Sequence, residues 1–160
     1  MVSSVGAVLT APGPRFTRDL LGVTVMTRVL FACVHNAGRS QMAAAYLRRL
    51  CDPARVEVLS AGTAPAEQVH PGVRDAMAEE GIDLSDARPQ RLTPQLGATV
   101  HLLVTMGCGD SCPVLPGTEV LDWPLPDPRG QGPDAVRAIR DEVRARVEAL
   151  VIARGWARGA

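Results

Sequence analysis

The residues most able to do chemistry stand in one short segment, where a cysteine is followed six positions later by an arginine. The segment reads Cys33-Val34-His35-Asn36-Ala37-Gly38-Arg39-Ser40. The arginine guanidinium offers parallel donors that match two oxygens of a tetrahedral oxyanion, and the loop amides can supply further N–H groups. We therefore predict that the backbone of Val34 to Gly38, with Arg39, holds phosphate or a phosphate mimic and that Cys33 is a nucleophile.

The segment joins two predicted elements. Residues 28–33 form a short apolar run, which is typical of a strand buried on both faces. Residues 40–50 carry apolar side chains at three- and four-residue steps, which predicts a helix. The positive end of that helix favours an anion, and Gly38 allows the backbone to turn tightly against a ligand.

A thiol in that field is expected to ionise easily, and the Ser40 hydroxyl can hydrogen-bond the thiolate. We expect His35 to contribute its backbone N–H rather than its ring. In the alternative interpretation Cys33 is a buried strand residue and Arg39 a surface charge. The strand–loop–helix context and the glycine favour the nucleophile.

The rest of the chain alternates strands with helices, which predicts a parallel sheet with helices on both faces. Strands are expected at 28–33, 56–61, 99–106 and 120–123, helices at 40–50, 71–81 and 133–155, and one helical turn within 83–96. Ligands bind beyond the carboxyl ends of such strands. Three loops should meet there: Cys33–Arg39, Gly107–Cys112 and Pro124–Arg129. We expect one domain over 26–155, a loose extension over 1–25 and a tail over 156–160.

Composition excludes several classes of protein. The chain has 160 residues, a formal net charge of +0 and 46% hydrophobic residues. This charge balance argues against nucleic-acid binding, and no apolar run approaches the ~20 residues of a membrane span. Four cysteines and no convincing secretory signal favour a reducing, cytoplasmic location. We expect a monomer.

Residues Cys33 to Arg39 resemble the signature loop of the low-molecular-weight protein tyrosine phosphatase superfamily. The strings CVHNAGRSQMAAA, SAGT at 60–63, VTMGCGDSCPVLPG at 104–117 and DWPLPDP at 122–128 resemble its thioredoxin-coupled arsenate reductase branch. The likeness covers about residues 26 to 150 in the same order. The resemblance implies that the Asn36 amide holds the shape of the signature loop. It implies a Rossmann-like, three-layer α/β fold with a four-stranded parallel sheet, arsenate as substrate, and phosphate or sulfate as mimics. We expect no bound cofactor and no metal, since Ala44 stands where an acidic residue of a cation site is expected.

Asp127-Pro128 lies in the third loop. An oxygen that leaves the central atom needs a proton, which a positioned carboxylic acid can give. The resemblance implies that Asp127 is this general acid. The competing carboxylate, Asp122, is expected to pair with a nearby arginine.

Cys108 and Cys112 separate a reductase from a phosphatase, because reducing arsenate to arsenite takes two electrons and two thiols that become a disulfide supply two. We predict a relay from Cys33 to Cys108 to Cys112, ending in an exposed disulfide that an external thiol protein reduces. Gly107 and Gly109 would let Cys108 swing. Two alternatives are that Cys108 and Cys112 form half of a zinc site or are unreactive thiols, and the sequence favours the relay over both. Cys51 is interpreted as structural.

By resemblance the reductant is thioredoxin, and a low-molecular-weight thiol with a glutaredoxin-like partner stays open. A phosphatase and a redox regulator without turnover are the rival functions. Against the phosphatase, Arg129 and Gly130 follow Asp127-Pro128 where phosphatases carry aromatic residues, although weak aryl-phosphatase activity remains compatible. We also expect His101 to be a core histidine and Trp123 and Trp156 to be packing residues.

Overall fold

The computed structural model describes residues 26–108 and 116–159. Within these two ranges, eight elements follow one another: β1 Thr27–Cys33, α1 Arg39–Leu50, β2 Val56–Gly62, α2 Pro71–Ala78, α3 Pro94–Gly97, β3 Leu102–Thr105, β4 Glu119–Asp122 and α4 Pro133–Arg154. The alternation of strands and helices that the sequence predicts is confirmed, and the helical turn expected within 83–96 is α3, which ends one residue later at Gly97.

The four strands form one parallel sheet in the order β2-β1-β3-β4. β1 lies in the middle, with Cys33 opposite Gly62 on β2 and Ala32 opposite Thr105 on β3. All carboxyl ends therefore share one edge of the sheet. The described parts of the three predicted loops meet at that edge, and the segment after β2, which the sequence analysis did not include, joins them there.

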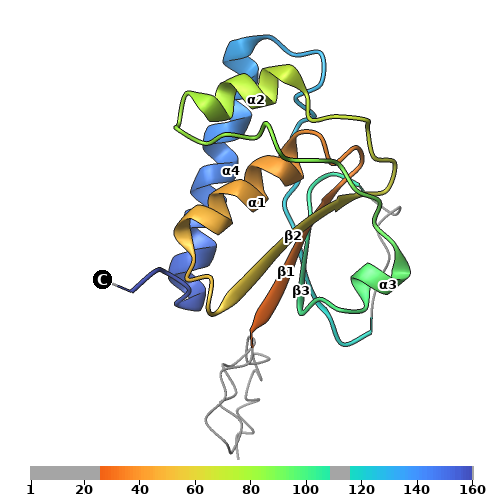
Figure 1. The fold of residues 1–160 in the computed structure, drawn as a ribbon, viewed down its shortest axis with the longest axis vertical. Helices are drawn as coiled ribbons and strands as arrows, with labels where there is room; N and C mark the ends of the chain where they lie inside the picture. Colours follow the sequence, from red (N-terminus) through yellow and green to blue (C-terminus); the bar gives the residue numbers. More distant parts are fainter. Residues whose placement is uncertain (1–25, 109–115, 160) are drawn as a thin grey trace, which may run out of the picture.

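Helices cover both faces of this sheet, which gives three layers (Figure 1). α1, α2 and α4 pack on one face around a large core that includes Phe31, Met42 and Val143. The short α3 covers the other face over a smaller cluster that includes Leu30 and Leu103. Within the described ranges, no helix is both long and apolar enough to cross a membrane.

Proline and glycine set the ends of several helices. Pro71 and Pro133 stand at the start of α2 and α4, where a missing N–H costs no helical hydrogen bond. Gly155 ends α4 with φ 66°, a left-handed conformation that favours glycine. Trp123 and Trp156 are buried, as expected of packing residues.

Strand β3 is shorter than the predicted range 99–106, and His101 is not a core residue. β3 pairs only from Leu102 onward, so His101 lies just outside the sheet at its amino edge and is exposed. Its Nδ1 atom accepts a hydrogen bond from the backbone N–H of Arg28 at 2.9 Å. The apolar run at 99–106 is therefore longer than the segment that pairs with β1 on one side and β4 on the other.

Arg140 of α4 is buried, although an arginine side chain is usually exposed unless it is paired. Its guanidinium donates to the Ala76 carbonyl and to the Glu79 carboxylate, both at 2.8 Å. Glu79 also accepts from Arg137. Hydrogen bonds from Arg137 and then Arg140 lower the pKa of Glu79 from 4.5 to about 2. This cluster ties the end of α2 to α4.

The lowered pKa of Glu79 predicts an acid-sensitive contribution to stability. The folded state favours the carboxylate, so the contribution is complete above about pH 4.5 and is lost as the pH falls toward about 2. Relative to wild type, Glu79→Gln should lower the free energy of unfolding at pH 7, and the difference should shrink at pH 3. Urea unfolding at both pH values measures it.

Glu142→Gln is the matched control, because Glu142 makes a single ion pair with Arg146 within α4. It should change the free energy of unfolding little at either pH. A difference between Glu79→Gln and wild type that stays constant from pH 7 to pH 3 would contradict the prediction.

Candidate active site

The loop after β1 is held by its carbonyl groups. Segment 63–70, which follows β2, donates to four of them: Thr63 N–H to Cys33, Ala64 to Val34, Ala66 to His35 and His70 to Ala37, at 2.8 to 3.2 Å. The two remaining carbonyls of the loop accept from α1, Asn36 from Gln41 Nε2 and Gly38 from Met42 N–H. Every carbonyl from Cys33 to Gly38 is thereby turned away from the centre of the loop.

The backbone N–H groups of the same loop, unlike its carbonyl groups, have no hydrogen-bond partner among the described residues. This holds for every backbone N–H between Val34 and Ser40. Unsatisfied N–H groups before the first turn of a helix are a binding site for an anion. The predicted oxyanion-binding residues, from Val34 to Arg39, are therefore brought together around Cys33.

Asn36 holds the loop from inside, as predicted. It adopts a left-handed conformation with φ 49°, which asparagine tolerates better than most residues. Its Nδ2 donates to Ser40 Oγ at 2.7 Å, and its Oδ1 accepts from the Gln90 N–H at 2.9 Å. The side chain thus ties the loop to α1 and to the chain before α3.

The Ser40 hydroxyl lies 2.9 Å from the Cys33 sulfur. Because Asn36 Nδ2 can only donate, it occupies a lone pair of Ser40 Oγ and leaves the hydroxyl hydrogen for the sulfur. A thiolate, which can only accept, would be stabilised by this hydrogen. Cys33 is 2% exposed and is a free thiol.

Arg39 points into the site and is nearly inaccessible, with 7% of its side chain exposed. Its Nη1 donates to the Leu125 carbonyl at 3.1 Å, while its buried Nε has no partner among the described residues. Its Nη2 lies 3.9 Å from Asp127 Oδ2. A buried guanidinium with donors to spare fits an oxyanion at the centre of the loop.

Asp127 lies at the rim of the same loop. Its Oδ1 accepts from the Arg129 N–H at 2.9 Å, and its backbone carbonyl accepts from Gln131 Nε2 at 3.0 Å. Its Oδ2 faces Arg39 and, at 3.8 Å, His35 Nδ1. The carboxylate is 40% exposed, so one oxygen is anchored while the other reaches the oxyanion site.

Asp122 does not pair with an arginine among the described residues. Its Oδ1 accepts from the Thr105 hydroxyl at 2.8 Å, across the pairing of β3 with β4. Asp122 ends β4 and its side chain is used within the sheet, so the expected arginine partner was wrong. The next loop, not the strand end, carries the carboxylate that reaches the site.

Three glycines allow backbone segments to approach the site closely. A Cβ at Gly38 would lie 2.6 Å from the Pro128 ring, and one at Gly62 would lie 2.6 Å from the Val34 carbonyl oxygen. A Cβ at Gly107, where φ is 93°, would overlap Arg39 Nη1. Gly38 thus lets Pro128, the residue after Asp127, pack closely against the start of α1.

Sequence reasoning missed the roles of Gly62, Gly107 and Gln90. For the two glycines a signal exists, because Gly62 ends β2 and Gly107 stands two residues after β3, both at the binding edge. For Gln90 none exists, since only its backbone N–H reaches Asn36. A backbone N–H is present at every residue except proline, so the residue type at position 90 does not indicate this hydrogen bond.

Cys108 lies beside β1 but on the other face of the sheet from Cys33. Its sulfur is 3.9 Å from the Ala32 carbonyl oxygen, and it packs in the smaller core with Leu30 and Leu103. Cys108 is disulfide-bonded and only 5% exposed, so the expectation of an exposed relay cysteine is wrong for this residue.

Cys112 and Gly109 lie outside the described residues. Cys51 is buried and free, in line with a structural role.

The close approach of Gly107 to Arg39 predicts that Gly107→Ala weakens anion binding. The added methyl group would push the guanidinium away from the loop centre, and the positive φ would strain any other residue. We expect the Kd for inorganic phosphate to rise about tenfold, which corresponds to about 1.4 kcal/mol. Isothermal titration calorimetry measures the change.

The control is Gly81→Ala. Gly81 has a comparable φ of 74° but nothing within 4 Å of the position that a Cβ would take. This variant should show the same backbone strain and an unchanged Kd. Equal affinities of the two variants for phosphate would contradict the role assigned to Gly107.

Comparisons with known proteins agree with this geometry. Residues 28–154 match the family model described as low molecular weight phosphotyrosine protein phosphatase. The chain is similar to a thioredoxin-dependent arsenate reductase structure from Corynebacterium glutamicum, with 41% identity and a TM-score of 0.71 over 81% of this chain and 62% of that one.

Two further relatives come from other bacteria. Arsenate reductase 1 of Bacillus cereus is 34% identical over 75% of this chain and 90% of its own length. The glutaredoxin arsenate reductase of Synechocystis is 33% identical over 79% of this chain and 97% of its own length. The chain therefore belongs to the low molecular weight phosphotyrosine protein phosphatase family, in the branch whose named relatives are arsenate reductases.

Proposed function

We propose that this protein reduces arsenate to arsenite, with Cys33 as nucleophile and Cys108 and Cys112 as a disulfide relay. The observation that carries the proposal is the Cys33 sulfur beside the Ser40 hydroxyl, at the centre of a loop whose amides are free and whose guanidinium is buried. The arsenate reductases among its relatives support the choice of oxyanion.

Arsenate occupies the loop with its oxygens on the amides of Val34 to Ser40 and on Arg39. The Cys33 thiolate attacks arsenic, and an S–As bond forms as an As–OH bond breaks. Asp127 Oδ2 gives its proton to the departing oxygen, which leaves as water. The product of this step is a Cys33 thioarsenate, in which arsenic is still As(V).

The thiolate of Cys108 then attacks the Cys33 sulfur. The S–As bond breaks, its electron pair stays on arsenic, and arsenite leaves as As(III) while a Cys33–Cys108 disulfide forms. Cys112 attacks Cys108 next, which frees Cys33 and leaves Cys108–Cys112. An external dithiol reduces this last disulfide by exchange.

The relay needs Cys108 to pass from one face of the sheet to the other. Cys108 belongs to the smaller core, whereas Cys33 packs with α1. Its sulfur already lies 3.9 Å from the carbonyl oxygen of Ala32, the residue before Cys33, so the path runs around the carboxyl end of β1. A disulfide at Cys108 together with a free Cys33 is compatible with the state of the relay before the external dithiol acts.

Thioredoxin is the proposed reductant, because a thioredoxin-dependent reductase is among the similar structures. A glutaredoxin-type partner is the second candidate, since a relative is named for that dependence. A cytoplasmic, monomeric enzyme without a bound cofactor completes the proposal.

A phosphatase is the alternative function, because the same loop and Asp127 suit a phosphate ester. An open pocket of about 410 Å³ adjoins the site, with His35, His70 and Arg129 in its wall. In the part of the chain that the structure describes, its lining contains no phenylalanine, tyrosine or tryptophan that would bind an aryl group. We therefore propose phosphatase activity as a weak side reaction.

The relay predicts multiple turnovers for wild type and none for Cys33→Ser, Cys108→Ser or Cys112→Ser. NADPH consumption with arsenate, thioredoxin and thioredoxin reductase measures turnover. Cys51→Ala is the control, because Cys51 is a buried free thiol outside the relay, and it should turn over like wild type. Sustained turnover by Cys108→Ser and Cys112→Ser would contradict the proposed disulfide relay. Oxidation of the wild-type thiols without continued arsenite release would indicate a redox regulator instead.

Asp127→Asn is expected to slow the first step about 100-fold, because an amide cannot give the leaving oxygen its proton. Phosphate affinity should change by less than about threefold, since the loop amides and Arg39 remain. Rapid-quench single turnover of arsenate, with calorimetry of phosphate, separates the two effects. An unchanged single-turnover rate would remove Asp127 from its role.

A further inference from the structure

The ring of His35 has no task in oxyanion binding, which uses only the backbone N–H of this residue. The side chain is 28% exposed, but its Nδ1 is buried and has no hydrogen-bond partner among the described residues. This atom faces Asp127 Oδ2 at 3.8 Å, just beyond a hydrogen bond. A buried ring nitrogen without a partner is unfavourable, so a small movement that closes this gap is favoured.

The two carboxylate oxygens of Asp127 are not equivalent. Oδ1 is anchored by the Arg129 N–H, whereas Oδ2 lies between Arg39 Nη2 at 3.9 Å and His35 Nδ1 at 3.8 Å. Oδ2 is therefore the oxygen that exchanges a proton with the substrate. Its orientation depends on the two groups that flank it, and Arg39 is already committed to the Leu125 carbonyl and the oxyanion.

His70 supports the ring of His35 from the other side. The two ring centroids are 6.4 Å apart at an interplanar angle of 65°, and the His70 N–H donates to the Ala37 carbonyl. Burial lowers the pKa of His70, with the Asp127 carboxylate acting in the opposite direction. His70 is thus held neutral near pH 7 and packs against His35 without competing for Asp127 as a cation.

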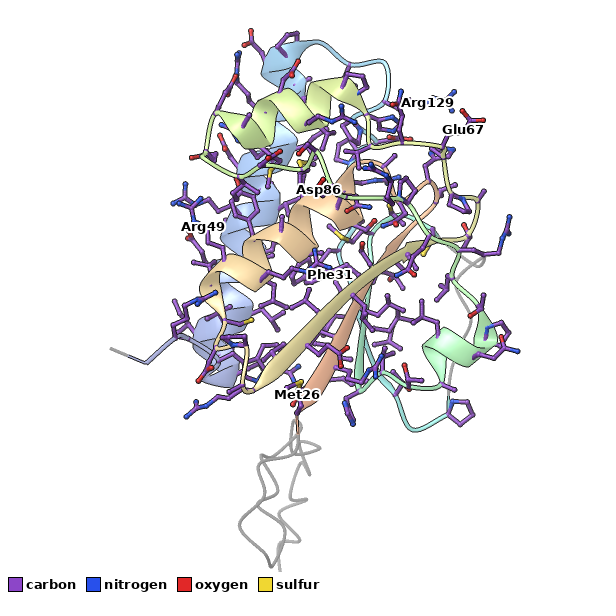
Figure 2. All side chains as sticks on the ribbon, in the orientation of Figure 1. Met26, Phe31, Arg49, Glu67, Asp86 and Arg129 are labelled. Atoms are coloured by element: carbon purple, nitrogen blue, oxygen red, sulfur yellow. The ribbon has the colours of Figure 1, made fainter. Side chains whose placement is uncertain are left out.

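Two other charged residues, Arg129 and Glu67, lie on the solvent-facing side of the His35 ring. They line the pocket that the His35 ring borders, and Figure 2 shows both at the end of the molecule opposite Met26. No hydrogen bond joins either side chain to His35 among the described residues. Asp127 is the one acidic group paired with the His35 ring there.

We propose that His35 is a positioning residue for the general acid, with its Nδ1–H directed at Asp127 Oδ2. The inference rests on the proposed role of Asp127. When Oδ2 gives its proton to the oxygen that leaves arsenic, the new carboxylate accepts a hydrogen bond from Nδ1–H. His35 keeps its own proton throughout, and no bond to it forms or breaks. The ring thereby holds Oδ2 toward the substrate and favours the ionised product of the step.

Three substitutions separate this role from simple packing. The side-chain amide nitrogen of asparagine can take the position of Nδ1, that of glutamine approximates Nε2, and phenylalanine supplies the ring without a donor. All three keep the backbone N–H that binds the oxyanion. His101→Asn is the control, because His101 is exposed at the opposite edge of the sheet.

His35→Phe and His35→Gln should each slow arsenate single turnover about tenfold, while His35→Asn should retain most of the wild-type rate. Phosphate Kd should stay within about twofold in all three. In the Asp127→Asn background, His35→Phe should cause no further loss, because the two side chains act as one unit. Equal rates for wild type and His35→Phe, or a full tenfold loss in the Asp127→Asn background, would overturn the proposal.

A second measurement does not depend on activity. Nitrogen-15 NMR of the histidine rings, with phosphate bound, should show the Nδ1–H tautomer at His35 and a shift of that signal in Asp127→Ala. An Nε2–H tautomer, insensitive to Asp127→Ala, would overturn the pairing. If wild type fails to reduce arsenate while the NMR result holds, the proposed function fails and the pairing of His35 with Asp127 stands.

Discussion

The active site depends on where the carbonyl groups of one loop go. Six consecutive carbonyls, from Cys33 to Gly38, accept hydrogen bonds from segment 63–70 and from α1. A peptide unit that turns its carbonyl outward turns an N–H inward, so the amides converge on the Cys33 sulfur. Removing these donors would leave buried carbonyls unpaired, which makes the inward direction of the amides the stable one.

This constraint explains why glycines surround the site. Gly62 sits under the loop and Gly107 beside Arg39, and a side chain at either position would displace the loop or the guanidinium. Gly38 admits Pro128, which brings the Asp127 loop to the start of α1. The site is thus assembled from backbone contacts between four strand ends, and its charged side chains are placed by those contacts.

The redox chemistry meets a different constraint. Side chains alternate along a strand, so Ala32 and Cys33 face opposite cores, and Cys108 packs in the one that Cys33 does not reach. The Cys108 sulfur is buried in the core that Leu96 of α3 also contacts, whereas Cys33 is a free thiol. The two halves of the proposed reaction are therefore separated by the thickness of the sheet.

The sequence by itself determined the strand–helix alternation, the shared carboxyl edge and the grouping of Cys33, Arg39 and Ser40 in one loop, because periodicity and local spacing are properties of short segments. Tertiary structure alone decided the exposure of Cys108, His101 and Arg140. Those outcomes depend on which neighbours cover a residue, and the neighbours come from distant parts of the chain. The position of His35 Nδ1 opposite Asp127 is of the same kind, since 92 positions separate two residues that only the sheet brings together.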